Sequence, residues 1–241
     1  MRDRYRGCLL GGAVGDALGA GIEFSSLAEI RREFGPAGVT GYVPCYGRSC
    51  AITDDTQMTL FTAKGLIRAH NRFSDRGISN VPAVVHWAYQ RWLFTHEGDA
   101  GAVPWDPEFP AGPSAWLAEQ PVLRHRRAPG TTCLASLHSV EAGTVEHRRN
   151  DSKGCGASCG SQRSGCCRPM LSTSPATSRP SPMGTLRDSS RRVPLPSWWR
   201  KLMAGKSLHR CVLEARHKVS GHPDGEEVTA AIGRGLGRGC R

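Results

Sequence analysis

Glycines recur every four residues near the N-terminus, and this spacing constrains the fold more than any other feature of the chain. Gly7, Gly11, Gly15 and Gly19 are interleaved with Leu and Val in the run RGCLLGGAVGDALGAGIEF. Positions four apart share one face of an α-helix, so the spacing predicts a helix with a bare stripe against which another backbone can lie. Each glycine costs a helix about 1 kcal/mol relative to alanine, so the stripe calls for a packing or ligand reason.

Two other interpretations of these glycines fail. A dinucleotide-binding loop requires a strand before the glycines and a βαβ unit around them, and neither is present in the pattern. A membrane span is excluded because Asp16 and Glu23 interrupt a run that is already too short to cross a bilayer. These two residues are the only acids between Asp3 and Glu29, and both lie among small residues.

A second motif, AITDDTQM at 51–58, places a hydroxyl and two adjacent carboxylates at the start of an apolar-periodic helix. The periodicity predicts that this helix runs from about Asp54 to His70. Mg²⁺ usually binds one or two carboxylates and keeps its other positions for water or substrate. Thr53 or Asp54 can cap the free amides while the next side chains project forward. Taken alone, such a run more often marks the start of a capped helix, where the acids only balance the helix dipole.

Two loops follow. RAPGTTCL at 127–134 predicts a turn that delivers a threonine cap to a helix beginning near Thr132. NDSKGCGA at 150–157 is polar and rich in glycine, and its amides could surround a phosphate or a ribose. Between the motifs, Pro82 suits the first turn of another helix, and residues 98–114 read as a surface loop. The aromatic residues of that helix could stack on bases, but packing is the favoured interpretation; they are His86, Trp87, Tyr89 and Trp92.

Taken in order, GCLLGGAVGDALGAGIEF, TDDTQM, RAPGTTCL and NDSKGCGA closely resemble the ADP-ribosylglycohydrolase family. The resemblance covers about residues 4–157 and returns weakly around 200–232. It implies an all-α, ADP-ribosylglycohydrolase-like helical domain around a site for two Mg²⁺ (or Mn²⁺) ions. It also implies hydrolysis of the bond between C1″ of ADP-ribose and a protein side chain or small molecule, through an oxocarbenium-like transition state.

The resemblance also implies roles for individual residues. Thr53, Asp54, Asp55 and Glu23 correspond to the metal site, and Glu23, Asp54 and Asp55 to its catalytic acids. Asp16 corresponds to a supporting acid. The implied substrate contacts come from the two loops and are Gly130, Thr131, Asn150, Ser152, Lys153, Gly154, Cys155 and Gly156. Thr131 stands where the family often has asparagine.

The pattern breaks after Ala157. Residues 158–192 hold nine Ser, four Pro and three Cys with one acid, and residues 158–200 hold seven Arg and no Lys. Such a composition buries too little apolar area to offset its ordering entropy and predicts a disordered basic insert. A zinc site is disfavoured because the cysteine spacing matches no finger or ribbon; the four candidates are Cys155, Cys159, Cys166 and Cys167.

A shifted reading frame explains more of this segment. With GC-rich codons for Ser158–Arg168, reading from the third base gives Val-Arg-Ile-Ala-Ala-Val-Gly-Leu-Leu-Pro. In the same frame, the codons of Pro182–Asp188 permit Thr-His-Gly-His-Pro-Ser-Gly. Both peptides resemble family segments that follow NDSKGCGA, and they occur in the right order. We therefore hypothesise that about residues 158–199 are translated out of frame.

Three regions follow from these observations: 1–157 as the N-terminal part of the domain, 158–199 as a low-complexity Arg/Ser/Pro segment, and 200–241 as partial, truncated C-terminal helices. In the last region Ser207 can cap a helix that carries Cys211, Val212 and Ala215. The family's second Asp-x-Asp-Thr motif is absent. Half of a metal shell should bind a divalent ion weakly, so we expect impaired or absent activity.

The charge leaves one alternative open. The net charge is +11, and more than half of it lies in residues 158–200. The smaller positive charge on the rest of the chain suits an enzyme that binds a pyrophosphate. We therefore expect the partner to be an ADP-ribosylated protein or small molecule. We expect no membrane partner, and nucleic acid is disfavoured. The alternative is a non-catalytic basic protein that binds nucleic acid or ADP-ribosylated partners through the Arg-rich segment. Ten cysteines without a signal peptide predict a cytoplasmic protein with reduced thiols.

Overall fold

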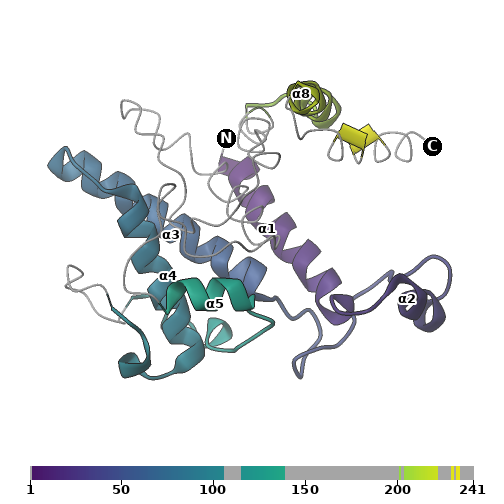
Figure 1. Cartoon of the computed structure of the whole chain (residues 1–241), viewed down its shortest axis with the longest axis horizontal. Coiled ribbons are helices and arrows are strands. Elements are labelled where there is room, and N and C mark those ends of the chain that lie inside the picture. Colours follow the sequence, from purple (N-terminus) through teal and green to yellow (C-terminus); the bar gives the residue numbers. More distant parts are fainter. Residues whose placement is uncertain are drawn as a thin grey trace.

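Two long antiparallel helices, α3 (Asp54–Arg76) and α4 (Val81–Glu97), form the centre of the molecule in a computed structural model of the chain (Figure 1). The structure describes residues 2–105, 115–138, 201, 204–221, 229–230 and 232–233. Within these ranges every regular element is a helix, which confirms the predicted all-α class. The remaining elements are α1 (Arg2–Gly19), η1 (Ala20–Ile22), α2 (Leu27–Phe34), η2 (Ala100–Ala102), η3 (Pro121–Leu123), α5 (Thr131–Leu137) and α8 (Leu208–Ser220).

The hydrophobic core lies between α3, α4 and α5. A close approach of α3 to α4 occurs at Gly65, where an added Cβ would lie 3.0 Å from the Cα of Val85. A buried hydrogen bond of 2.6 Å joins the hydroxyls of Thr62 and Tyr89 across the same interface. The core side chains with the least exposure include Met58, Phe61, Tyr89, Trp92, Leu93, Leu123 and Leu137. Burial of His86, Trp87, Tyr89 and Trp92 in α4 agrees with packing and leaves no free face for base stacking.

The caps explain where these helices begin and end. Asn80 accepts a hydrogen bond from the amide of Ala83 and caps α4, with Pro82 in the first turn as predicted. The helix expected to stop near His70 continues to Arg76, because no residue breaks it before Gly77. Gly77 has a φ of 71° and donates its amide to the carbonyl of Phe73, the left-handed ending that glycine adopts without strain.

The helix α2 was not predicted, although the sequence contains its signal. Ser26 and Glu29 form a reciprocal capping box, in which the Glu29 amide donates to the Ser26 hydroxyl and the Ser26 amide donates to the Glu29 carboxylate. Figure 1 shows α2 beyond the C-terminal end of α1, away from the α3–α4 pair.

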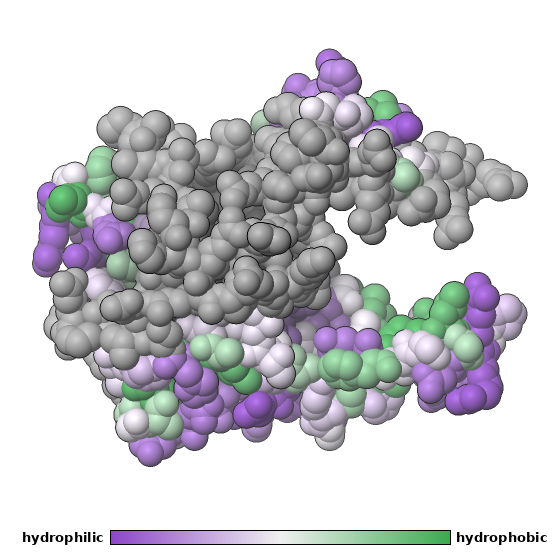
Figure 2. Space-filling view, viewed as in Figure 1, coloured by the Kyte–Doolittle hydropathy of each residue, from purple (hydrophilic) through white to green (hydrophobic). Residues whose placement is uncertain are grey.

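The first helix departs from its prediction in one respect. Residues 7–19 are helical as expected, but no described residue lies within 4 Å of a Cβ built at any of the four periodic glycines. The expected close contact with another backbone is therefore wrong for the described part of the chain. Leu10, Val14 and Leu18, four apart on the same helix, are also exposed, and apolar side chains reach the surface near α1 and α2 in Figure 2.

In the C-terminal region, α8 begins after Ser207, whose hydroxyl accepts a hydrogen bond from the amide of Arg210 at 3.4 Å. Cys211 and Ala215 are buried, as the predicted helix face requires. Lys201 and Glu214 form an ion pair beside them. The Arg/Ser/Pro segment 158–199 and its hypothesised change of reading frame lie outside the described residues. In the described part, no helix is long and apolar enough to cross a membrane.

Candidate functional site

The site is built around Thr53, the N-cap of α3. Thr53 is buried and has extended backbone angles of φ −103° and ψ −167°. Its hydroxyl oxygen accepts a hydrogen bond from the amide of Asp55 at 3.3 Å. This cap satisfies one of the free amides of the first turn and leaves the carboxylates of Asp54 and Asp55 at the positive end of the helix dipole.

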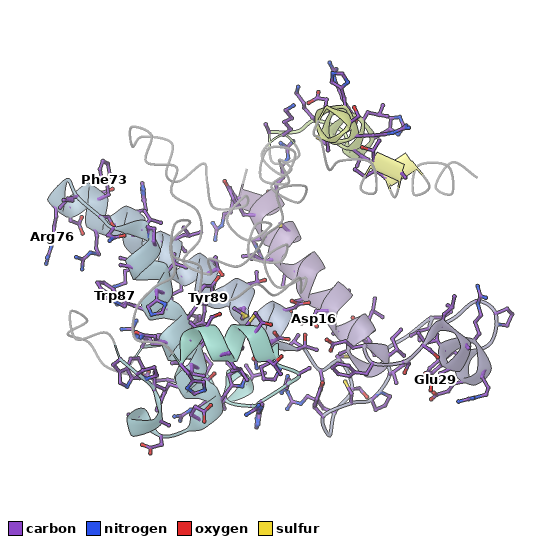
Figure 3. All side chains as sticks on the ribbon, in the orientation of Figure 1. Asp16, Glu29, Phe73, Arg76, Trp87 and Tyr89 are labelled. Atoms are coloured by element: carbon purple, nitrogen blue, oxygen red, sulfur yellow. The ribbon has the colours of Figure 1, made fainter. Side chains whose placement is uncertain are left out.

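Asp16 of α1 holds this helix start in place. Its carboxylate accepts hydrogen bonds from the amide of Thr53 at 2.9 Å and from the Thr53 hydroxyl at 2.7 Å. It also accepts hydrogen bonds from the amide and the hydroxyl of Thr56. Figure 3 shows Asp16 on α1 beside the beginning of α3. Because four donors occupy its oxygens, Asp16 is positioned to anchor the two helices rather than to bind a ligand.

Glu23 follows η1 and reaches the same group of acids. The residue is exposed, yet partial desolvation of its carboxylate and the neighbouring charges of Asp55 and Asp16 raise its pKa above the ordinary value. The raised pKa reflects desolvation first and then the negative charges of Asp55 and Asp16. The structure therefore brings Glu23 close enough to Asp55 and Asp16 for an electrostatic interaction.

The turn that precedes α5 is bonded to the same helix start. The amide of Asp54 donates to the carbonyl of Arg127 at 3.0 Å, and the amide of Gly130 donates to Asp54 Oδ2 at 3.4 Å. Thr131, predicted to contact substrate, is exposed and is the first residue of α5. The turn contains Ala128 at a φ of 51°, a left-handed conformation that is costly for a residue with a Cβ.

Two buried side chains that the sequence analysis did not single out support this junction. Gln57 donates to the carbonyl of His125 at 3.0 Å and accepts a hydrogen bond from the indole of Trp92 at 3.1 Å. Arg127 donates from Nη1 to the carbonyl of Ile52 at 3.0 Å. Neither position carries a local sequence signal, because both depend on contacts between segments distant in sequence.

A tight turn at Cys45–Arg48 lies beside the acids. The backbones of Cys45 and Arg48 exchange two hydrogen bonds of 3.0 and 3.1 Å, and Tyr46 has a φ of 51°. Desolvation first and then Glu23 raise the pKa of the Tyr46 phenol. The chain just before this turn approaches η1 closely at Gly21, where an added Cβ would lie 2.5 Å from the Val43 side chain.

The donor chemistry fits a hard divalent cation, but the described residues supply only part of a shell. Asp54 and Asp55 offer carboxylate oxygens, and the Thr53 hydroxyl lies between them and Asp16. The raised pKa of Glu23 indicates local negative charge that a cation would offset. Among the described residues, no three His, Cys, Asp or Glu side chains converge closely enough to hold a metal ion.

The second predicted substrate loop cannot be placed. Its residues lie outside the described ranges; they are Asn150, Ser152, Lys153, Gly154, Cys155 and Gly156. The site described here therefore comprises the start of α3, Asp16, Glu23, the 127–130 turn and the 45–48 turn.

Comparison with known proteins agrees with the motifs. A family model described as ADP-ribosylglycohydrolase matches residues 1–190. The chain is 42% identical over 67 residues to ADP-ribosyl-[dinitrogen reductase] glycohydrolase of Rhodospirillum rubrum, an alignment that covers 27% of this chain and 23% of that protein. No solved structure matches the chain significantly.

Proposed function

Because the chain belongs to the ADP-ribosylglycohydrolase family, we propose that it is built to hydrolyse the bond between C1″ of ADP-ribose and a protein side chain or small molecule, with a divalent cation bound at the start of α3. The observation that carries this proposal is the attachment of Thr53 to Asp16, which fixes two adjacent carboxylates at a helix start beside Glu23 and the 127–130 turn. The alignment with the Rhodospirillum rubrum glycohydrolase covers less than a quarter of that protein, so its substrate does not carry over.

We propose that the cation is bound by the side chains of Asp54, Asp55, Thr53 and Glu23. The family typically uses Mg²⁺, and carboxylate and hydroxyl oxygens are the ligands that this ion prefers. A bound cation would orient the ribose hydroxyls and lower the pKa of a bound water. Asp16 keeps Thr53 and Thr56 in place and so determines where the ligand oxygens point.

In the reaction, a water molecule attacks C1″ and the bond to the leaving group breaks with its electron pair. In this proposal the exposed carboxylate of Glu23, which lies near Asp55 and Asp16, accepts a proton from that water. The proton that Glu23 accepts then passes to the leaving group with the electron pair of the broken bond, so that water is added across the bond and ADP-ribose is released. In this proposal Gly130 and Thr131, at the start of α5, contact the substrate beside Asp54.

We further propose that activity is weak in this chain. In the described part, the acids do not complete a metal-binding group, and an incomplete shell should bind Mg²⁺ weakly.

Release of ADP-ribose from a modified peptide tests the function. We expect slow, Mg²⁺-dependent release that is abolished in Asp54→Ala and Asp55→Ala. Asp75→Ala is the matched control, because Asp75 is an exposed acid near the other end of the same helix. Rapid turnover would refute the impairment, and release that persists in both site variants would refute the assignment of the site.

The alternative function rests on residues 158–200, which lie outside the described part of the chain. A basic protein of this kind would bind arbitrary DNA with a strong dependence on salt. Deletion of residues 158–200 would then abolish DNA binding. The hydrolase proposal expects that the full chain does not bind DNA.

A further inference from the structure

Arg127 is the most deeply buried charged residue near the site. Its relative exposure is 2%, and it lies between η3 and α5. No described carboxylate lies within ion-pair distance of its guanidinium, and its Nε has no hydrogen-bond partner in the described part. Burying a charge without a direct ion pair is costly, and the nearby charge of Asp16 offsets part of that cost for Arg127.

The contacts of Arg127 bracket a single residue. Its guanidinium Nη1 donates to the carbonyl of Ile52 at 3.0 Å, and its own carbonyl accepts the amide of Asp54 at 3.0 Å. Ile52 and Asp54 are the two neighbours of Thr53 in the chain. Arg127 therefore fixes the backbone on both sides of the N-cap of α3.

Asp16 holds Thr53 through different atoms. It accepts from the amide and hydroxyl of Thr53, whereas Arg127 contacts the peptide groups before and after this residue. Asp16 and Arg127, both far from Thr53 in sequence, thus bond six groups at this helix start: the amide and hydroxyl of Thr53, the Ile52 carbonyl, the Asp54 amide, and the amide and hydroxyl of Thr56. These hydrogen bonds are more than a helix cap needs, since one hydrogen bond to a side chain usually suffices.

We infer that Arg127 is a positioning residue that aims the carboxylates of Asp54 and Asp55 at the cation by clamping the backbone on either side of Thr53. The inference rests on the proposed function, because it takes the carboxylates as cation ligands. Residues that orient metal ligands without touching the metal typically contribute about 10–100-fold in metal affinity.

Two substitutions separate the parts of this role. Arg127→Met keeps a long apolar side chain but removes the donor and the charge, and Arg127→Lys keeps the charge but loses the planar guanidinium that reaches Ile52. Arg126→Met is the matched control, because Arg126 is the adjacent residue and is exposed.

The experiment measures two quantities on the full chain without substrate: hydrogen exchange of the Asp54 amide in the absence of metal, and Mn²⁺ affinity by electron paramagnetic resonance. For Arg127→Met we expect exchange at Asp54 to be at least about 10-fold faster and Mn²⁺ affinity to be about 10–100-fold lower. Arg127→Lys should lie between wild type and Arg127→Met, and Arg126→Met should match wild type. Exchange at Leu93, in the core of α4, should not change in any variant that remains folded.

Each other outcome has a distinct meaning. If the Asp54 amide of Arg127→Met exchanges at the wild-type rate, the inference is overturned. It is also overturned if exchange is faster but Mn²⁺ affinity is unchanged, because Arg127 would then have a purely structural role. If wild type binds no Mn²⁺, the proposed function fails, and exchange at Asp54 still decides whether Arg127 clamps Thr53. If Arg127→Met also accelerates exchange at Leu93, the comparison rests on Arg127→Lys, and wild-type values there would overturn the inference.

Discussion

At the scale of single residues, the start of α3 depends on partners that no local pattern reveals. The sequence predicts that Thr53 or Asp54 caps a helix, and Thr53 does so. The bonds from Thr53 to Asp16 cross 37 positions of the chain, and those of Arg127 to Ile52 cross 75. Residue type and spacing therefore identify the candidate acids, but only tertiary packing decides that Asp16 anchors the helix start.

Replacement of Asp16 tests this division of roles. Asp16→Asn keeps the size of the side chain but replaces one acceptor oxygen with a donor that faces the amides and hydroxyls of Thr53 and Thr56. We expect the free energy of unfolding to fall by about 2–3 kcal/mol, because hydrogen bonds to a charged acceptor are lost and donors are left unpaired. Urea denaturation measures the change. Asp75→Asn, on the exposed end of α3, should change stability by less than about 0.5 kcal/mol, and an equal loss in both variants would contradict the anchoring role.

His96 at the end of α4 makes stability depend on pH. Burial and then the nearby charge of Arg126 lower the pKa of His96 from 6.5 to about 4. Its ring meets Trp92 edge to face at 4.5 Å. Because the folded state holds the ring neutral, the unfolded state binds the extra proton between pH 6.5 and 4, and stability falls as the pH falls through that window.

Denaturation as a function of pH measures this contribution. With solvent screening of the partly exposed ring, we expect wild type to lose about 1–2 kcal/mol between pH 6.5 and 4 through His96. His96→Phe keeps an aromatic ring beside Trp92 and should flatten this part of the profile. The exposed His209 of α8 provides the control, since His209→Phe should keep the wild-type slope. A profile for His96→Phe that parallels wild type would show that His96 is not the group responsible.

At the scale of the elements, the apolar periodicity and the caps predicted α1, α3, α4 and the helix after Thr132 close to their observed positions. The errors have local physical causes. Helix α3 continues six residues beyond its predicted end because its apolar face weakens before the chain reaches the left-handed stop at Gly77, and α2 depends on the capping box of Ser26 and Glu29 rather than on a long apolar face. The sequence predicts that the glycines of α1 lie against a neighbouring backbone. In the structure, such a close approach occurs at Gly65 of α3, against Val85 of α4.

A pair of glycine substitutions tests that last difference. In Gly65→Ala the new Cβ would lie 3.0 Å from the Val85 backbone, so we expect a loss of about 1–3 kcal/mol despite the better helix propensity of alanine. In Gly11→Ala, on the periodic glycine stripe of α1, the Cβ would meet nothing within 4 Å, and we expect a gain of about 0.5–1 kcal/mol. Thermal unfolding distinguishes the two. Destabilisation by Gly11→Ala would show that a neighbour does pack against this face of α1.

At the scale of the whole molecule, the family model and the composition describe residues 158–190 differently. The family match extends to residue 190, whereas the composition of 158–199 departs from the rest of the chain and carries much of the net charge of +11. The match ends inside the altered stretch, after the family motifs of residues 1–157. The hypothesis stays a prediction.

The nucleotide sequence of the gene decides it. If residues 158–199 are out of frame, the codons of Ser158–Arg168 will encode an amphipathic apolar segment when read from the third base, and the frame will be restored near Trp198–Lys201. A chain synthesised with the restored peptide should then gain apolar residues, lose most of the positive charge of this segment and bind Mn²⁺ more tightly, because the residues after the 150–156 loop would again follow the family pattern. Codons that exclude the apolar peptide would end the hypothesis and leave an Arg-rich insert as the native sequence. The basic segment would then have to be explained by a partner rather than by the gene.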